Sequence, residues 1–205
     1  MINAREQFGE IDIYLFDQIL KNRFEVKTAI LDAGCGGGRN LVYFLRNNFQ
    51  VFAVDENPLA IEQVRLLARQ LAPQLSAENF QVSKVENMPF PDESFDAVIS
   101  NAVLHFAPDE QIFQQMIDEM WRTLKKGGLF FARLASTIGI EKKVRQIEDR
   151  RYLLPDGSER FLVDEAFLTF VTNRLGGTWL EPLKTTNVQN MRSMSTWVLR
   201  KNLNF

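Results

Sequence analysis

Residues 29–40 read AILDAGCGGGRN, a short apolar run that ends in an acid and continues into four glycines. Such a pattern is typical of a buried strand that turns directly into a helix. Glycine has no Cβ atom, so it adopts positive φ angles and lets the backbone come close to a ligand, and Gly34, Gly36 and Gly38 concentrate that freedom in one turn. The stretch therefore predicts a strand-to-helix turn that cradles a nucleotide.

Glycine-rich turns also occur in dinucleotide-binding proteins, whose pattern GxGxxG or GxGxxA requires a small residue about five positions after the first glycine. That position is Arg39 when the count starts at Gly34 and Leu41 when it starts at Gly36, so neither register fits. The spacing of an acid, Asp32, followed by glycines at alternate positions instead resembles that of the class I S-adenosylmethionine-dependent methyltransferases. The resemblance implies S-adenosylmethionine as the cofactor and S-adenosylhomocysteine as its product.

A second motif, residues 51–56 (VFAVDE), reads as a buried strand that ends in an acid about 20 residues after the glycine turn. An acid at this place accepts hydrogen bonds from both hydroxyls of a ribose. We therefore expect Asp55, with Glu56 beside it, to hold the ribose of the cofactor. The alternative is that Asp55 caps the helix that opens at Pro58, since acids suit a helix start.

A third motif, residues 82–101, is similar to the adenine-contacting turn of this family and the fourth strand that follows it. In relatives an acid in the turn commonly receives the adenine amino group, and the next residue offers its backbone amide to the ring. Lys84 stands at the position of that acid, which leaves Val85 to hold the ring and makes Glu86 the nearest carboxylate. A fourth motif, residues 124–132, resembles the family's turn into the fifth strand.

The resemblance also assigns residues to the amino-acid end of the cofactor. Helix amides after Gly36 and Gly38 would face the methionine carboxylate, whose charge suits a helix N-terminus, and Asp32 would lie near the ammonium group or hold the turn in shape. Arg39 would pair with that carboxylate or with one in the protein. The cofactor-binding residues predicted in this way are Asp32, Gly34, Cys35, Gly36, Gly38, Arg39, Asn40, Asp55, Glu56, Val85, Glu86 and Asn101.

His105 follows the fourth strand, where the family places residues that face the transferred methyl group. Its ordinary pKa of about 6.5 suits a group that accepts a proton from a nucleophile, so His105 is the catalytic candidate, with a structural role as the alternative. Residues 100–103 read SNAV and lack the Asn-Pro-Pro-Tyr-like motif of relatives that methylate nitrogens in nucleic acids or proteins. Amino-methylation of DNA or glutamine is therefore disfavoured.

Two observations favour a small-molecule acceptor. Residues 36–55 resemble the tellurite-resistance and related small-molecule branch of the superfamily, whereas residues 89–96 resemble the quinone and sterol methyltransferases, so the branch stays open. The formal net charge of −2 disfavours a nucleic-acid partner, because binding to long RNA or DNA relies on a basic surface. The alternatives are a tRNA methyltransferase and a non-catalytic S-adenosylmethionine-binding or regulatory protein, the latter suggested by Lys84.

Other features exclude further classes. The chain contains no apolar run of about 18 residues and no secretory signal pattern, so we expect no membrane span and a cytoplasmic protein. Cys35 is the only cysteine and His105 the only histidine, which excludes an internal disulfide and a cysteine-cluster metal site. No metal site is expected, and the sequence assigns no oligomeric state.

The alternation of strand and helix patterns predicts an α/β, Rossmann-like, seven-stranded and mostly parallel sheet with helices on both faces and an antiparallel C-terminal hairpin. Strands are expected near residues 29–32, 51–55, 80–85, 95–100, 128–135, 178–187 and 193–200, and helices near residues 39–48, 58–71, 109–124 and 164–175. A chain of 205 residues supports one well-buried core. We expect a single methyltransferase domain over residues 1–205, made of an N-terminal helical cap (1–26), a cofactor-binding half (27–136), an inserted substrate-side segment (137–161) and a C-terminal helix with strands six and seven (162–205).

The inserted segment interrupts this alternation with a charged stretch and with Pro-Asp-Gly at residues 155–157, a turn signal that predicts a small hairpin over residues 152–162. In this family an insertion after the fifth strand lies over the substrate side. The polar side chains of the segment either meet an anionic or oxygen-rich substrate or belong to a solvated charged helix; they are Arg150, Arg151, Tyr152 and Arg160. In the cap, Tyr14 and Phe16 either cover the cofactor or pack in the core.

Overall fold

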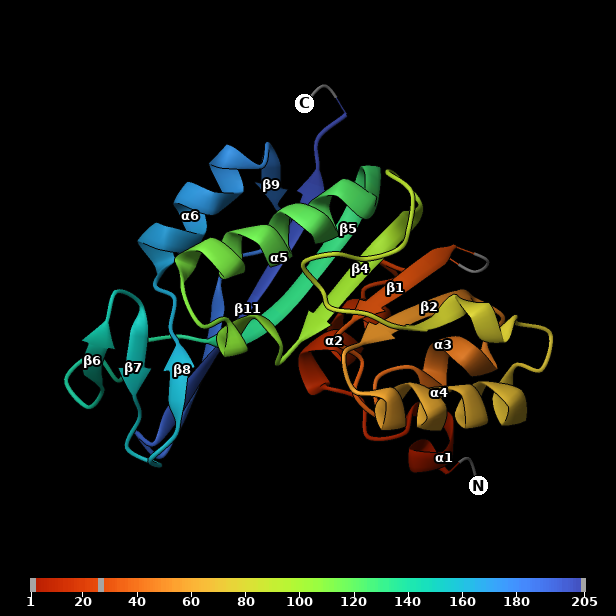
Figure 1. Ribbon diagram of the computed structural model, residues 1–205, viewed down its shortest axis with the longest axis horizontal. Helices are drawn as coiled ribbons and strands as arrows, with labels where there is room; N and C mark the ends of the chain where they lie inside the picture. The colour runs from red at the N-terminus through yellow and green to blue at the C-terminus, as the bar shows by residue number, and fades with distance from the viewer. Residues whose placement is uncertain (1–2, 26–27, 204–205) are drawn as a thin grey trace.

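The computed structural model describes residues 3–25 and 28–203, which form a main sheet of eight strands with helices on both faces (Figure 1). The strand order is β10–β11–β5–β4–β1–β2–β3, and β9 pairs with β11 outside this path. Strands β1 to β5 pair in parallel, whereas β11 runs antiparallel to β5, β9 and β10. The predicted Rossmann-like mixed sheet with an antiparallel C-terminal part is confirmed.

The elements have the following bounds. The strands of the main sheet are β1 (Ala29–Ala33), β2 (Gln50–Asp55), β3 (Phe80–Val82), β4 (Phe95–Asn101), β5 (Leu124–Ala135), β9 (Gly177–Trp179), β10 (Lys184–Val188) and β11 (Arg192–Lys201). The helices are α1 (Ala4–Phe8), α2 (Ile13–Leu20), α3 (Val42–Arg46), α4 (Pro58–Leu71), α5 (Glu110–Thr123) and α6 (Glu165–Arg174), with 3-10 turns η1 (Ala77–Asn79) and η2 (Leu104–Phe106). A separate three-stranded sheet contains β6 (Arg145–Glu148), β7 (Arg151–Leu153) and β8 (Glu159–Phe161).

The carboxyl ends of the central parallel strands meet at one edge of the main sheet. Asp32 of β1 is in register with Ala53 of β2 and with Ile99 of β4, so Asp55 and Asn101, which end these two strands, lie at the same edge. The strand order reverses here, because β2 and β4 flank β1 on opposite sides. Open α/β sheets bind ligands in the crevice at such a reversal, so the topology alone positions a site.

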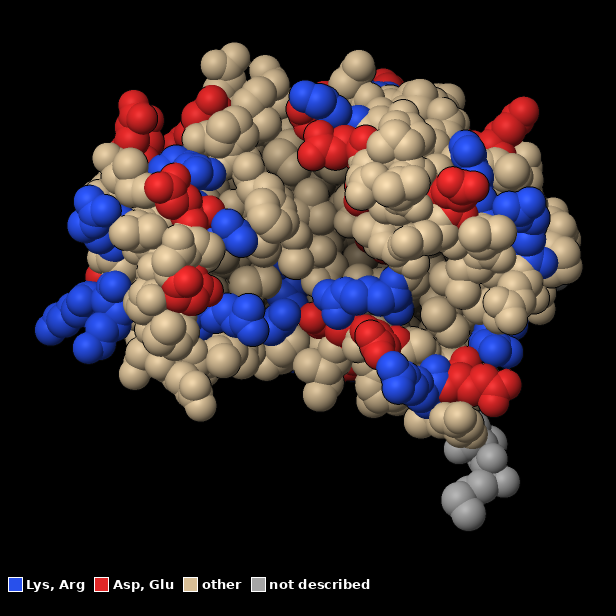
Figure 2. Space-filling view, turned by 60° about the horizontal axis from the view of Figure 1, so that its bottom comes forward, with Lys and Arg blue, Asp and Glu red and all other residues tan. Residues whose placement is uncertain are grey.

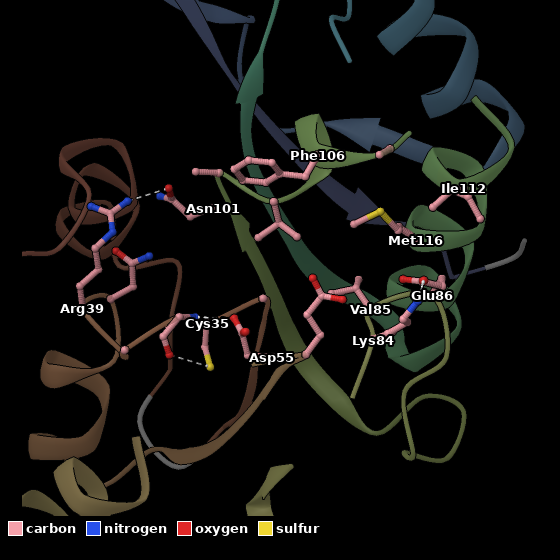
Figure 3. Close-up of a pocket in the computed structure, with 18 of the residues that line it drawn as sticks. Cys35, Arg39, Asp55, Lys84, Val85, Glu86, Asn101, Phe106, Ile112 and Met116 are labelled. Carbon is pink, nitrogen blue, oxygen red and sulfur yellow. Dashed lines mark hydrogen bonds and ion pairs between the residues drawn. The ribbon is translucent and has the colours of Figure 1, made fainter. Parts of the chain in front are cut away.

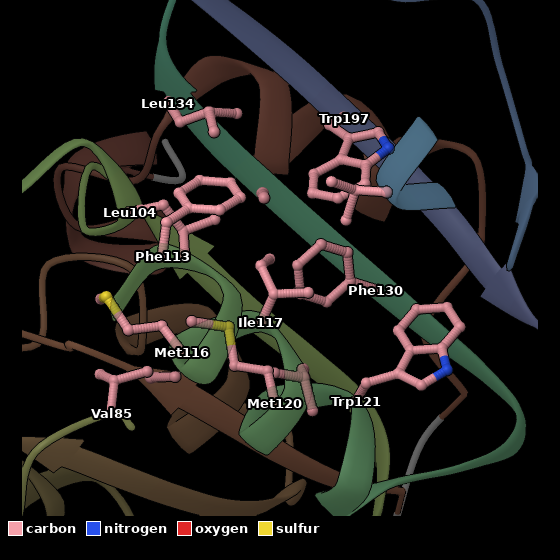
Figure 4. Packing of buried hydrophobic residues seen from close by; sticks show 14 of the residues in the cluster. Val85, Leu104, Phe113, Met116, Ile117, Met120, Trp121, Phe130, Leu134 and Trp197 are labelled. Carbon is pink, nitrogen blue, oxygen red and sulfur yellow. The ribbon is translucent and has the colours of Figure 1, made fainter. Parts of the chain in front are cut away.

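Apolar side chains bury both faces of the main sheet. On one face, α5 presents Phe113, Ile117 and Met120 at intervals of one and two turns, and these pack with Phe130 of β5 and Trp197 of β11 (Figure 4). On the other face, α2, α3 and α4 pack against the opposite sides of the same strands. Burial on both faces explains why the central strands read as continuous apolar runs rather than alternating ones.

The C-terminal part contains one strand more than predicted. The strand expected over residues 178–187 is interrupted around Pro182, so β9 and β10 are separate strands that both pair with β11. Proline has no N–H group to donate to a strand ladder, which makes a break at this position favourable. The main sheet therefore has eight strands in the described part of the chain. Seven of them follow one another across the sheet, and β9 pairs with β11 outside that order.

The inserted segment forms strands and no solvated charged helix. Residues 145–148 form β6, which pairs with β7, and the predicted hairpin is present as β7 and β8. The helix expected over residues 39–48 is also shorter, because residues 38–41 form a turn in which the amide of Leu41 donates to the carbonyl of Gly38 before α3 begins.

The predicted junction at residues 26–27 lies outside the described residues, as do residues 1–2 and 204–205. The division into a cap, a cofactor-binding half, an insertion and a C-terminal part stays a prediction. Within residues 3–25 and 28–203, no helix combines the length and the apolarity that a membrane crossing requires.

Candidate functional site

A cavity of about 760 Å³ opens at the carboxyl ends of β1, β2 and β4, and it forms a hollow on the face seen in Figure 2. The close-up in Figure 3 shows Arg39, Asn101 and Phe106 at one end and Lys84, Val85 and Glu86 at the other. The lining residues are Gly34, Cys35, Gly36, Gly37, Arg39, Asn40, Asp55, Glu56, Lys84, Val85, Glu86, Asn101, Ala102, Val103, Phe106, Ala107, Pro108, Ile112 and Met116.

The glycine turn forms the floor of the cavity, and two of its glycines have distinct roles. Gly34 has a φ of 82°, and a Cβ atom there would lie 2.4 Å from a methyl carbon of Val103, so this glycine lets the loop after β4 pack on the turn. Gly36 has a φ of 51°, and nothing lies within 4 Å of the position that a Cβ atom would take. The backbone at Gly36 is therefore bare towards the cavity, as close contact with a ligand requires.

The carboxylate of Asp55 holds the turn from the neighbouring strand. One oxygen accepts from the amide of Gly36 at 2.8 Å, and the other accepts from the amide of Asn57 at 2.9 Å. The N-cap of α4 is Asn57, whose side chain accepts from Leu59, so Asp55 is not the helix cap. Each carboxylate oxygen has a further lone pair, and both Asp55 and Glu56 line the cavity.

Asp32 lies directly beneath the turn and is 1% exposed. Neither of its carboxylate oxygens has a hydrogen-bond partner among the described residues, so it does not hold the turn through hydrogen bonds. Burial raises the pKa of Asp32 to about 7, an effect that the charge of Arg39 opposes and the charge of Asp55 reinforces. A buried carboxylate without a partner is costly, and a cationic group nearby would stabilise its charged form.

The far end of the cavity is apolar with charged residues at its edge. Val85 is buried and belongs to the same apolar cluster as Met116 of α5, with Ile112 packed beside them. Lys84 is largely exposed, and its ammonium group lies 3.8 Å from a carboxylate oxygen of Glu86. This end therefore combines an apolar slot with one carboxylate that can accept hydrogen bonds.

Arg39 and Asn101 form a polar pair at the opposite end. A guanidinium nitrogen of Arg39 donates to the Asn101 Oδ1 atom at 2.9 Å (Figure 3). Because a guanidinium has no acceptor, this contact fixes the orientation of the amide. The Nδ2 donor of Asn101 is then buried without a partner in the described part of the chain.

The segment before α2 is tied to the glycine turn. The side chain of Asn40 accepts from the amide of Asp12 at 3.0 Å, and the carboxylate of Asp12 accepts from Arg133 at 3.1 Å. The guanidinium of Arg133 also lies 5.0 Å from the ring centre of Tyr14. The N-terminal segment is therefore fixed beside the polar end of the cavity.

His105 does not line the cavity. It lies in η2, is buried, and its Nδ1 atom accepts a hydrogen bond from the amide of Ala135 at 3.3 Å. Burial, reinforced by the charges of Arg160 and Arg133, lowers the pKa of His105 to about 4. The imidazole is therefore neutral at pH 7 with its proton on Nε2, and its role as the catalytic base stays a prediction that this geometry does not favour.

Ten of the predicted cofactor-binding residues line one cavity, whereas Asp32 and Gly38 lie behind its surface. The thiol of Cys35 is buried at the turn, and burial raises its pKa strongly. In the described ranges no group of His, Cys, Asp and Glu side chains is arranged to hold a metal ion.

The sequence did not predict eight of the residues that line the cavity: Gly37, Ala102, Val103, Phe106, Ala107, Pro108, Ile112 and Met116. Ile112 and Met116 carry a helical spacing, but that signal cannot separate a ligand slot from the core.

Comparison with known proteins identifies the family. The family model described as "Methyltransferase domain" matches residues 31–132. The uncharacterized methyltransferase YodH of Bacillus subtilis is 27% identical over 166 residues, which cover 81% of this chain and 62% of YodH. An arsenite methyltransferase of Mus musculus is 27% identical over 127 residues, or 57% of this chain and 33% of that enzyme. The chain thus spans less than two thirds of either relative.

Among solved structures, an S-adenosylmethionine-dependent methyltransferase from Methanosarcina mazei superimposes with a TM-score of 0.75 at 22% identity, over 91% of this chain and 98% of that one. This likeness concerns the fold. The matched family model covers the glycine turn, the acid that ends β2 and the strands around the cavity. The chain belongs to the class I S-adenosylmethionine-dependent methyltransferases.

Proposed function

We propose that the protein transfers the methyl group of S-adenosylmethionine to a small-molecule acceptor. The observation that carries the proposal is the bare backbone at Gly36 beside a buried carboxylate, Asp32, that has no partner among the described residues. A zwitterionic amino-acid group fits this arrangement, because the open backbone at Gly36 lets the group approach closely and Asp32 favours its ammonium charge. The residues of the cavity therefore fit the cofactor of the family.

The other parts of the cavity fit the remaining parts of the cofactor. The free lone pairs of Asp55, with Glu56 beside it, would accept hydrogen bonds from the ribose hydroxyls. Val85 and the apolar side chains of α5 would enclose the adenine ring, and Glu86 would accept from its amino group in place of the acid that Lys84 replaces. These assignments follow the chemistry of each lining residue.

When bound, S-adenosylmethionine supplies a methyl group on a sulfonium, and its transfer is an in-line displacement by the acceptor. The protein mainly binds, orients and excludes water. Val103, Phe106 and Pro108 from the loop after β4 keep one wall of the cavity apolar. Asn101 and Arg39 hold the wall at the polar end through their hydrogen bond.

A small-molecule acceptor is supported by the net charge of −2, which provides no broad basic surface for RNA. The mouse relative is named for a small inorganic substrate, arsenite. A tRNA methyltransferase and a non-catalytic S-adenosylmethionine-binding protein are the competing functions. Conversion of S-adenosylmethionine to S-adenosylhomocysteine distinguishes the two methyltransferase functions from the non-catalytic binding protein.

The test combines binding and turnover. Isothermal titration with S-adenosylmethionine, S-adenosylhomocysteine and NAD should show binding of the two sulfur compounds and none of NAD. An acceptor screen that measures S-adenosylhomocysteine formation should then find turnover with small molecules and none with unmodified tRNA. Binding of neither sulfur compound would contradict the whole proposal. Turnover with tRNA alone would mean that the acceptor is tRNA and not a small molecule.

A further inference from the structure

The open mouth of the cavity contains an exposed aromatic ring and basic side chains. Phe106 lines the cavity and is 58% exposed. Figure 2 shows Lys and Arg side chains gathered along the lower margin of the hollow, on both of its sides. The arginines of this region come from Arg39 next to the glycine turn, from β5 and from the three-stranded sheet.

Three of these arginines are neutralised by a carboxylate. Arg133 pairs with Asp12 at 3.1 Å. Arg151 pairs with Glu159 at 3.2 Å and also donates to the carbonyl of Ala107.

Arg150 has a structural role. It pairs with Asp164 at 2.9 Å, and its guanidinium lies 3.9 Å from the ring centre of Phe167. Arg150 thus anchors the small sheet to α6 and is not available to a ligand.

Arg160 of β8 is different. Its guanidinium carbon lies 4.8 Å from the ring centre of Phe106, and its one side-chain hydrogen bond in the described part of the chain goes to the carbonyl of Glu159. No carboxylate oxygen of the described residues lies within 4.0 Å of its guanidinium group. The pKa of Asp156 is lowered mainly by two hydrogen bonds from Ser158, and the charge of Arg160 makes a smaller contribution. Arg160 therefore presents a positive charge over the exposed ring at the cavity mouth.

Arg39 is the second such side chain. It is exposed, lines the cavity, and donates to the Oδ1 atom of Asn101 and the carbonyl of Glu10, which are both neutral acceptors. Two guanidinium groups without a carboxylate partner among the described residues thus face the same opening from different elements. A cationic acceptor would be repelled there, whereas an anionic oxygen group would be attracted.

We propose that the methyl acceptor carries a carboxylate or phosphate group, and that Arg160, with Arg39, binds this group at the mouth beside Phe106. The inference rests on the proposed function, because it places the acceptor next to the bound cofactor. Guanidinium groups recognise both anions through paired N–H donors, so the structure defines the shared chemistry of an oxyanion. Arg160 packs on Phe106 at the mouth but is not itself a residue of the cavity lining, so in this scheme it is a specificity residue.

The test measures the binding of simple aromatic anions to protein saturated with S-adenosylhomocysteine. Isothermal titration compares benzoate and phenyl phosphate with benzamide, which has the same ring but no charge. We expect at least one anion to bind about tenfold tighter than benzamide, and Arg160→Gln to weaken the binding of that anion about fivefold. Arg160→Lys keeps the charge and should retain part of the affinity. The matched control is Arg145→Gln, since Arg145 is exposed on β6 of the same small sheet, and it should stay within about twofold.

The outcomes separate the inference from the proposed function. Equal binding of benzamide, failure of both anions to bind, or unchanged affinity in a folded Arg160→Gln variant would overturn the inference while S-adenosylhomocysteine still binds. A preference for benzoate or for phenyl phosphate decides which oxyanion the acceptor carries. If S-adenosylhomocysteine itself does not bind, the proposed function fails and the inference fails with it.

Discussion

The cavity and the three-stranded sheet beside its mouth are built in different ways. The cofactor side consists of backbone and buried groups: a turn with three positive φ angles, the carboxylate of Asp55 bound to the Gly36 amide, and the buried Asp32. The three-stranded sheet contributes no residue to the cavity lining, and it carries long, partly or fully exposed arginines on or next to strands of three or four residues.

This difference agrees with the proposed division between cofactor binding and acceptor specificity. Backbone geometry and buried charge tolerate few substitutions, so they suit a cofactor that is always the same. Exposed ion pairs contribute little to stability and can be exchanged at small cost, so they suit an acceptor site that differs between relatives. The following predictions test this contrast, beginning with the largest expected effect.

Gly34→Ala should be the most damaging of these changes. A Cβ atom at Gly34 would meet Val103 at 2.4 Å in a backbone with a φ of 82°. We expect a loss of roughly 3 kcal/mol in the free energy of unfolding, from strain and overpacking together. Gly157→Ala is the matched control, because Gly157 has the same φ of 82° and nothing within 4 Å. It should cost only about 1 kcal/mol in urea unfolding. Equal losses would show that the turn tolerates a side chain.

Asp55→Ala should weaken the binding of S-adenosylhomocysteine about 100-fold, because two charge-assisted hydrogen bonds and the expected ribose contact are lost together. Isothermal titration measures this directly. The control Glu62→Ala removes an exposed acid of α4 whose side chain has no hydrogen bond or ion pair among the described residues, and it should change the affinity by less than about twofold. An unchanged affinity in Asp55→Ala would remove the ribose assignment.

Asp32→Asn should alter how stability depends on pH. The pKa of Asp32 is raised to about 7 in the folded protein, so between about pH 4 and pH 7 the folded state binds a proton that the unfolded state lacks. This contribution to stability is fully present below about pH 4 and is lost as the pH rises through 7, by up to about 1.4 kcal/mol per unit. Denaturant unfolding from pH 5 to pH 8 should show a flatter profile for Asp32→Asn than for the wild type.

Cofactor binding gives a second readout of the same residue. An ammonium group near Asp32 favours its charged form, so the binding of S-adenosylhomocysteine at pH 6.5 should release protons in the wild type and fewer in Asp32→Asn. Titrations in buffers with different ionisation enthalpies measure the number released. Equal proton release by both proteins would place the ammonium group away from Asp32.

The sequence predicted the cofactor side better than the other side, for physical reasons. The bounds of α4 match the predicted residues 58–71, because Asn57 and Pro58 fix the start of the helix locally. The glycine turn was equally predictable, since its spacing reflects backbone conformations that few other residues adopt.

Tertiary contacts decided what the sequence could not predict. Residues 145–148 have no strand alternation and are strand only because β7 pairs with them. The ion pairs that neutralise Arg150 and Arg151 but not Arg160 depend on which side chains the fold brings together. The sequence could not show that Ile112 and Met116 line the cavity, because residues of the core and residues of a binding cavity have the same helical spacing.

His105→Asn should have the smallest effect on turnover. Asparagine keeps an acceptor for the amide of Ala135, which is the contact that holds His105 under the loop after β4. Since His105 does not line the cavity, we expect kcat to stay within about threefold for any acceptor found. A loss of about 100-fold with an intact fold would instead establish His105 as the proton acceptor.

The pH dependence of stability tests the burial of His105 without an acceptor. The pKa of His105 is lowered from its ordinary value to about 4, so the unfolded state binds a proton that the folded state lacks between about pH 4 and pH 6.5. The resulting stability is present above about pH 6.5 and is lost as the pH falls towards 4. Replacing the imidazole by a group that does not titrate should reduce the difference in unfolding free energy between pH 7 and pH 5 by about 2 kcal/mol. An unchanged difference would mean that His105 reaches water and takes up its proton in the folded state, which the buried packing position does not allow.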